Sequence, residues 1–232
     1  MMWTEWNLKE YIDYLEEPKL LITPWRTVKL FDNWFLETIT QGPYWLTPIA
    51  TLPFVYYFLT LAQTTFNETC MMFAAGLMFW TFFEYSLHRF IFHGERYWVP
   101  DNQYAIACHF VLNGIHHAYP QDYMRTVFPV IPLAFILYYF MITPCRAVLP
   151  EYVADAFIAG LILGYCMFEE MHYFTHYGQS SIKYLRRVTR VHMHHHYRGG
   201  DMDFGVTTTF WDWLFGTYTS LEVEKQRLIK SD

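Results

Sequence analysis

The histidines of this chain fall into short groups, and their spacing indicates metal binding. The chain has eleven histidines, and none lies in its first 87 residues. Nine of them, with one asparagine, form four patterns that read HxxxxH, NxxHH, HxxxH and HxxHH. These ten residues are His88, His93, Asn113, His116, His117, His172, His176, His192, His195 and His196. Imidazole is the commonest metal ligand near neutral pH. Because a structural zinc site closes with four ligands, this number of imidazoles predicts two metal ions held close together.

Helical spacing predicts how the patterns present their rings. Residues four apart share one face of a helix, so His172 and His176 are expected to point at one ion. The pattern at 192–196 presents two ring faces within one turn. His88 and His93 are five apart, and a continuous α-helix would splay them. Either the helix ends soon after His88, or the two histidines reach different metals.

Two acidic residues are candidates to support ligating histidines. Glu84 and Glu169 each lie about one helical turn before a histidine of the patterns. A carboxylate in that place can accept the spare ring N–H of a ligand and so orient it. The other two histidines are expected outside the metal site. His109 is interpreted as an ordinary hydrogen-bonding residue, and His194 as a surface spacer within its pattern.

The patterns leave the metal and its chemistry open. Imidazole shells suit zinc, copper, iron and nickel alike. A zinc pair would favour hydrolysis, whereas an iron pair would favour activation of O2 and attack on a C–H bond. A membrane protein that binds or transports metal without redox chemistry is the alternative from another class. Transport requires ionisable residues within the spans. The candidates Glu84 and Asp155 both lie near the ends of apolar stretches, which counts against transport.

The composition indicates a membrane protein. Of 232 residues, 53% are hydrophobic and only 16% are charged, against about 25% charged in an average soluble domain. The net charge of −6 argues against a nucleic-acid partner. Four apolar stretches are predicted to span a bilayer, at about 47–66, 70–87, 127–142 and 153–168. The last two are short enough that buried helices of a soluble bundle remain an alternative.

The basic residues predict the sidedness of these spans. If the chain starts in the cytosol and crosses at each stretch, fifteen of its sixteen lysines and arginines share the cytosolic side. Only Arg146 lies opposite. Cytosolic loops of membrane proteins carry this excess of positive charge. The same topology places every histidine on the cytosolic side.

The remaining segments carry little chemistry. Residues 1–46 do not resemble a signal peptide, since no basic region followed by an apolar run is seen near residue 1, and they are interpreted as a cytosolic or interfacial lead. Residues 47–219 are expected to form one catalytic domain, and 220–232 a polar tail. The four cysteines, Cys70, Cys108, Cys145 and Cys166, show no CxxC spacing and are expected to be reduced.

Five segments of the chain resemble a known family. They are 80–93, 109–129, 172–176, 191–197 and 204–217, which contain the four histidine patterns and a closing FGVTTTFWDWLFGT stretch. Together they are similar to the integral-membrane fatty acid hydroxylase superfamily, and within it to the fatty acid 2-hydroxylases. The resemblance covers about residues 43–219.

The resemblance implies an all-α integral membrane fold, with four transmembrane helices and a cytosolic helical cap that holds a dinuclear metal site. It implies two iron ions, which zinc can replace in purified material, bound by the nine patterned histidines. It implies O2-dependent hydroxylation of carbon 2 of a long-chain acyl group, free or in ceramide, in the endoplasmic reticulum. Another lipid oxidation, by a desaturase or sterol oxidase, is the alternative within this class.

The chain departs from the family pattern in two places. The family's second pattern normally begins with histidine, and here that position is Asn113, whose carbonyl would bind a metal more weakly. Many relatives also carry a cytochrome b5 domain with a His-Pro-Gly-Gly motif, which is not found in this sequence. An external electron donor is therefore expected, namely cytochrome b5 with its reductase. Tyr119, Asp122 and Arg125 are predicted to contact the head group of the substrate.

Overall fold

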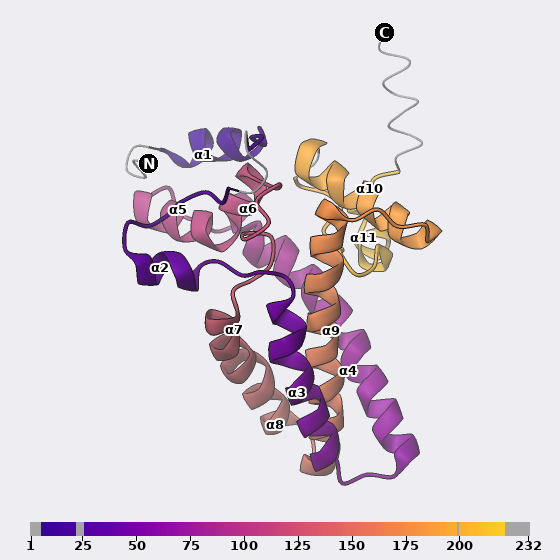
Figure 1. The fold of residues 1–232 in the computed structure, drawn as a ribbon. Coiled ribbons are helices and arrows are strands. Elements are labelled where there is room, and N and C mark those ends of the chain that lie inside the picture. The colour runs from indigo at the N-terminus through magenta and orange to yellow at the C-terminus, as the bar shows by residue number, and fades with distance from the viewer. Residues whose placement is uncertain (1–5, 22–25, 199, 221–232) are drawn as a thin grey trace. The chain divides into compact units, whose positions relative to one another are not determined.

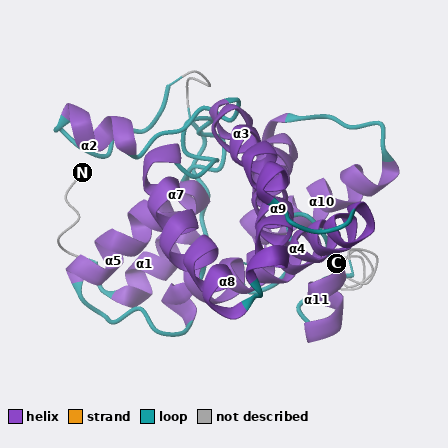
Figure 2. Ribbon diagram, turned by 90° about the horizontal axis from the view of Figure 1, so that it is seen from below, coloured by secondary structure: helices purple, strands orange, loops and turns teal. Residues whose placement is uncertain are grey.

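The computed structural model describes residues 6–21, 26–198 and 200–220. In this part of the chain every regular element is a helix (Figure 2), as the sequence predicted. The chain divides into two compact units. The first consists of Leu21–Glu84 and Gln121–Tyr173, and the second of Met2–Leu20, Tyr85–Pro120 and Phe174–Asp232.

The first unit is built from apolar helices (Figure 1). They are α3 (Leu46–Leu61), α4 (Phe66–Leu87), α7 (Val130–Ile136), the π-helical segment η4 (Leu137–Ile142), α8 (Thr143–Val148) and α9 (Glu151–Tyr177). Of α4 the residues up to Glu84, and of α9 those up to Tyr173, belong to this unit. Three helical segments are long and apolar enough to cross a membrane, namely Phe66–Phe92, Val130–Val148 and Glu151–Tyr177. The remaining predicted stretch, 47–66, forms the shorter apolar helix Leu46–Leu61, which ends before the predicted limit at residue 66.

The helix ends differ from those that hydropathy predicted. The third helical segment begins after Pro129 rather than at residue 127, because Pro129 has extended backbone angles. It also continues past residue 142 to Val148. The helix α9 runs nine residues beyond the predicted end at 168, to Tyr177. Its last turns contain Glu169, Glu170 and two histidines, polar residues that a search for apolar runs leaves out.

Glycines allow α4 and α9 to pack in direct contact. A Cβ atom on Gly76 would lie 2.0 Å from the carbonyl oxygen of Phe157, and one on Gly160 would lie 2.0 Å from that of Phe73. Close approach through small residues is characteristic of helix pairs in membranes. On its other side α9 packs against α3, through a core that includes Val55, Phe58 and Ile158. The outward side chains of these helices are apolar as well, for example Phe54, Phe135 and Phe140.

A short helix and a loop complete the first unit. The helix α2 (Trp34–Ile39) is capped by Asn33, whose side chain accepts from the N–H groups of Phe35 and Leu36. Glu37 on this helix forms a partly buried ion pair of 2.6 Å with Arg125. All four cysteines lie in the described residues and are free.

The second unit surrounds an amphipathic helix that carries three of the patterned histidines. This helix, α10 (Lys183–Arg198), buries Val188, His192, His195 and His196. Its other elements are α1 (Leu8–Leu15), η1 (His88–Phe92), η2 (Gly94–Arg96), α5 (Gln103–His109), η3 (Phe110–Gly114), α6 (Ile115–Ala118) and α11 (Phe210–Phe215). The predicted N-terminal lead thus contains a helix, α1, capped by Asn7 and Glu10. The predicted polar tail, 220–232, lies outside the described residues from 221 onward.

Candidate metal centre

The nine patterned histidines converge into two buried groups. The five-histidine group consists of His116, His172, His176, His192 and His196. The four-histidine group consists of His88, His93, His117 and His195. Within each group, one nitrogen from every ring lies within 4.8 Å of all the others. Each group could therefore hold a metal ion.

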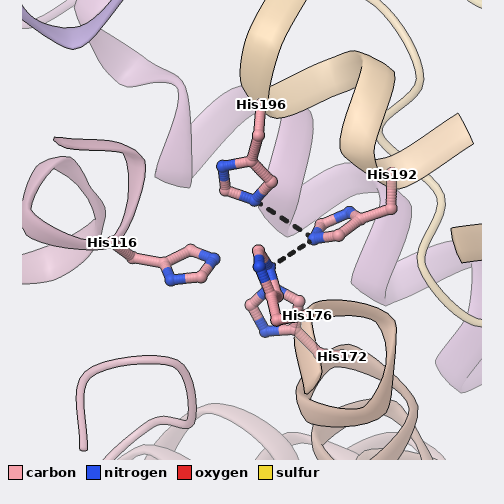
Figure 3. A group of neighbouring side chains, drawn as sticks. All are labelled: His116, His172, His176, His192 and His196. Carbon is pink, nitrogen blue, oxygen red and sulfur yellow. Dashed lines mark hydrogen bonds between the residues drawn. The ribbon is translucent and has the colours of Figure 1, made fainter. Parts of the chain in front are cut away.

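The ring nitrogens of the five-histidine group point toward one another (Figure 3). His192 Nε2 lies 3.0 Å from His176 Nε2 and 3.1 Å from His196 Nε2. His172 lies one helical turn before His176 on α9. Metal–imidazole bonds are about 2.0–2.1 Å long, so ligands of one ion lie roughly 3–3.4 Å apart. The observed spacing matches that range.

The four-histidine group depends on a π-helical turn. The N–H of His93 donates to the carbonyl of His88 across five residues, at 3.1 Å. The segment His88–Phe92 is accordingly π-helical. The α-helix ends at Leu87, close to the predicted end near Arg89, so the first sequence interpretation is confirmed. The second is wrong, because His88 and His93 lie in one group, and a π turn places residues five apart on one side.

Acceptors behind three rings orient the four-histidine group. His88 Nδ1 donates to the carbonyl of Phe204 at 2.5 Å, and His195 Nδ1 to that of Met202 at 2.6 Å. His93 Nδ1 donates to the carboxylate of Glu95 at 2.9 Å. In a neutral imidazole only one nitrogen carries hydrogen. The Nε2 atoms of these rings therefore present lone pairs to the group.

The lone pairs explain why these residues fit a cation. His93 Nε2 and His195 Nε2 face each other at 3.0 Å. With both Nδ1 atoms acting as donors, no hydrogen lies between the two Nε2 atoms, and a metal ion would relieve their repulsion. Among the described residues, no hydrogen-bond partner reaches the buried Nε2 of His117 or Nδ1 of His196. Buried polar atoms are rarely left in this state without a ligand or water.

Burial also keeps the rings in the form that binds metal. Burial, and after it the neighbouring imidazoles, lowers the pKa of four histidines well below the usual value, namely His116, His117, His195 and His196. They are neutral at pH 7, as ligation requires.

A polar pocket in the second unit opens onto the histidines. Its volume is about 260 Å³, and its lining includes His93, Glu95, Arg96, His117 and His195. His196 of the five-histidine group also lines it.

Comparison with known proteins decides the family. The model of the fatty acid hydroxylase family matches residues 73–217, which contain all nine histidines. The chain belongs to the fatty acid hydroxylase family. The resemblance seen in the sequence is therefore confirmed.

Two curated relatives show how far the hydroxylase similarity extends. The ceramide very long chain fatty acid hydroxylase SCS7 of Saccharomyces cerevisiae is 37% identical over 90% of this chain and 53% of its own length. The chain thus spans about half of that relative. The dihydroceramide fatty acyl 2-hydroxylase FAH2 of Arabidopsis thaliana is 31% identical, over 94% of this chain and 90% of its own.

A solved hydroxylase structure has the same fold. It is described as full-length scs7p with only the hydroxylase domain visible. It aligns with a TM-score of 0.87 at 35% identity, covering 94% of this chain and 81% of that one.

Within this hydroxylase fold, the two acidic residues predicted to orient ligating histidines are both buried. Glu169 is buried and accepts from the N–H of Phe128 at 3.1 Å. Glu84 is also buried, at 2% exposure. Their predicted role behind ligating histidines stays a prediction. His194 is not the surface residue that the sequence suggested, because its side chain is 9% exposed and lies 2.9 Å from Asp203.

Asn113 and His109 both contact the carbonyl of Phe92, the residue before His93. Asn113 Nδ2 donates to the carbonyl of Phe92 at 2.8 Å. His109 Nε2 lies 2.8 Å from the same carbonyl and 2.9 Å from Glu95. The expected hydrogen-bonding role of His109 is confirmed, whereas the predicted ligand role of Asn113 stays a prediction.

The residues predicted to contact substrate are largely used by the fold. Asp122 is fully buried and accepts from the Thr27 hydroxyl and the Val28 N–H. Arg125 donates to Glu37 and to the backbone carbonyl of Val28. Arg125 thus takes part in a partly buried ion pair with Glu37. Tyr119 is half-buried, and its hydroxyl lies 3.2 Å from that of Tyr14.

Sequence reasoning missed Glu95 and the role of the closing segment. Glu95 follows His93 by two residues, and this HxE spacing was the available signal. The closing segment supplies the Phe204 carbonyl to His88. The Asp212 carboxylate in turn holds the N–H groups of Phe204 and Gly205, each at 2.8 Å.

Proposed function

We propose that this chain hydroxylates carbon 2 of long-chain fatty acyl groups, free or in ceramide, using O2 and a pair of iron ions. The observation that carries the proposal is the convergence of nine histidines into two buried groups in a fatty acid hydroxylase. The names of the relatives support the substrate class, since they are hydroxylases of ceramide and dihydroceramide acyl chains.

The histidines would hold one ion in each group. Bound iron would supply the reduction of O2 that attack on an unactivated C–H bond requires. The chain's own residues orient the ligands through Nδ1 and exclude water by burial. Hydroxylation consumes O2, two electrons and two protons for each alcohol and water formed. The electrons would come from an external donor, which we take to be cytochrome b5 with its reductase.

We further propose that four helices cross the membrane of the endoplasmic reticulum. Three are long enough by themselves, and Leu46–Leu61 would be the fourth. The bias of basic residues supports a cytosolic position for the histidines. Residues 47–219 would form the catalytic domain. In the first unit, an apolar pocket of about 280 Å³ between Phe79, Cys145 and Phe157 is a candidate space for an acyl chain.

Restoration of 2-hydroxy sphingolipids tests the activity. The chain is expressed in cells that lack their own 2-hydroxylase, and lipids are measured by mass spectrometry. We expect product with the unaltered chain and a loss of at least a hundredfold with His172→Ala. A matched control is His194→Gln, a histidine outside both groups. Equal product from the unaltered chain and His172→Ala would contradict a catalytic role for the groups.

The same measurement separates the alternatives. Hydroxylation adds one oxygen atom to the acyl chain, whereas desaturation removes two hydrogens. A product two mass units lighter would identify a desaturase. Two bound ions without any lipid product would favour a metal-binding protein without catalysis.

A further inference from the structure

Glu95 sits at the centre of a layer of side chains behind the four-histidine group. Its carboxylate is 5% exposed, and it follows the turn that carries His93. One oxygen accepts from His93 Nδ1 at 2.9 Å, and the other lies 2.9 Å from His109 Nε2. Of the acceptors behind His88, His93 and His195, only this one carries a charge; the other two are backbone carbonyls.

The layer continues away from the metal group to the N-terminal helix. The hydroxyl of Tyr11, a fully buried residue of α1, lies 2.7 Å from His109 Nδ1. His109 Nε2 and Asn113 Nδ2 both lie 2.8 Å from the carbonyl of Phe92, the residue before His93. Glu95 thus contacts the ring of His93, whereas His109 and Asn113 contact the peptide carbonyl just before it.

A third side chain faces Glu95. The Nε of Arg96 lies 3.6 Å from the same carboxylate oxygen that contacts His93.

We propose that Glu95 is the positioning residue of one ion of the pair. It holds the ring of His93 so that Nε2 faces the four-histidine group, and it acts on that ion without acting on the ion of the five-histidine group. His109 and Tyr11 hold Glu95 in turn, and Asn113 serves this layer by holding Phe92. The inference rests on the proposed function of the two groups as a dinuclear metal centre.

A chelator titration of the purified full-length chain tests this assignment. The chain in detergent is loaded with zinc, and ions per chain are counted by mass spectrometry as chelator is added. The unaltered chain should hold two ions. In Glu95→Gln, one ion should be lost at roughly 10–100-fold lower chelator strength, as is usual when a partner of a ligating histidine is removed. The second ion should behave as in the unaltered chain.

The matched control is Glu16→Gln. Glu16 also lines the polar pocket and pairs with Arg96 at 3.1 Å, but it belongs to the exposed rim. This variant should keep both ions. Release of both ions together from Glu95→Gln, or retention of both with unaltered affinity, would overturn the assignment.

A second variant covers the case in which Glu95→Gln does not fold. Tyr11→Phe removes only the hydroxyl that reaches His109 and should weaken the same single ion to a smaller degree. Unchanged release would overturn the assignment. An unaltered chain that holds two ions but makes no 2-hydroxy lipid would refute the proposed function and leave the role of Glu95 intact. An unaltered chain that holds fewer than two ions would overturn both.

Discussion

The two units of the chain form helical cores of opposite character. In the first, α4 and α9 meet through glycines, and α9 meets α3 through Val55, Phe58 and Ile158. In the second, the buried residues include eight of the nine patterned histidines and the carboxylates of Glu95, Asp203 and Asp212. An apolar core depends on fit, whereas a polar core depends on every donor and acceptor having its partner.

This difference predicts which changes each unit tolerates. The first unit should be most sensitive to added volume where helices touch. The second should be most sensitive to loss of single polar atoms, and its losses should appear in metal binding as well as in stability. Three substitutions, taken from the largest expected effect to the smallest, test this contrast.

Added volume at Gly160 should have the largest effect on stability. A Cβ there would lie 2.0 Å from the backbone oxygen of Phe73, which cannot rotate away as a side chain could. We expect Gly160→Val to cost about 3 kcal/mol, at the upper end of the usual penalty for overpacking. Thermal unfolding in detergent measures it. Met167→Val is the control, because Met167 lies on the same helix and is 43% exposed. Equal midpoints for the two variants would show that the helices are not in close contact.

Loss of the Asp212 carboxylate should have an intermediate effect that reaches the metal. Burial raises the pKa of Asp212 to about 6, so the group is mainly ionised at pH 7. It accepts from Phe204, Gly205 and the Thr217 hydroxyl, each at 2.8 Å. Asp212→Ala leaves buried donors without an acceptor and should cost about 2 kcal/mol.

The same variant should weaken zinc binding at the four-histidine group. The Phe204 carbonyl orients His88, and loss of such a partner typically costs 10–100-fold in metal affinity. A chelator titration measures this, with Asp201→Ala as the control because Asp201 is exposed. Lower stability together with unaltered zinc affinity would mean that the closing segment supports the fold alone.

The contrast also explains how much could be predicted from the sequence. Apolar runs are local, so hydropathy located the four long apolar helical segments of the first unit. It missed the last turns of α9, because their polar residues serve the histidine groups and not the apolar core. The division of the pattern at 192–196 into two ring faces was predicted correctly, since i and i+4 share a helix face. His192 and His196 indeed lie in one group and His195 in the other.

The parts that could not be predicted depend on residues distant in sequence. The π turn that begins at His88 brings His88 and His93, five residues apart, to the same side of the helix. Nothing in the HxxxxH pattern distinguishes such a turn from the end of a helix. The partner of Glu95 beyond His93 is His109, and the partner of His109 is Tyr11, 98 residues away. Asp122 and Arg125 looked available for a substrate, but they hold the Thr27 hydroxyl and the backbone of Val28.

The smallest effect is expected at His194, which tests whether histidine number or position defines the centre. His194 lies between residues of the two groups on α10, yet its Nδ1 lies 2.9 Å from Asp203 Oδ2. Glutamine can donate to the same carboxylate, so His194→Gln should cost about 1 kcal/mol or less, the scale of one hydrogen bond. It should keep both zinc ions. His195→Gln, the neighbouring change, should lose the ion of the four-histidine group. If instead His194→Gln lost an ion and His195→Gln kept both, the assignment of His195 as a metal ligand would be wrong. His194 would then be the ligand on this helix.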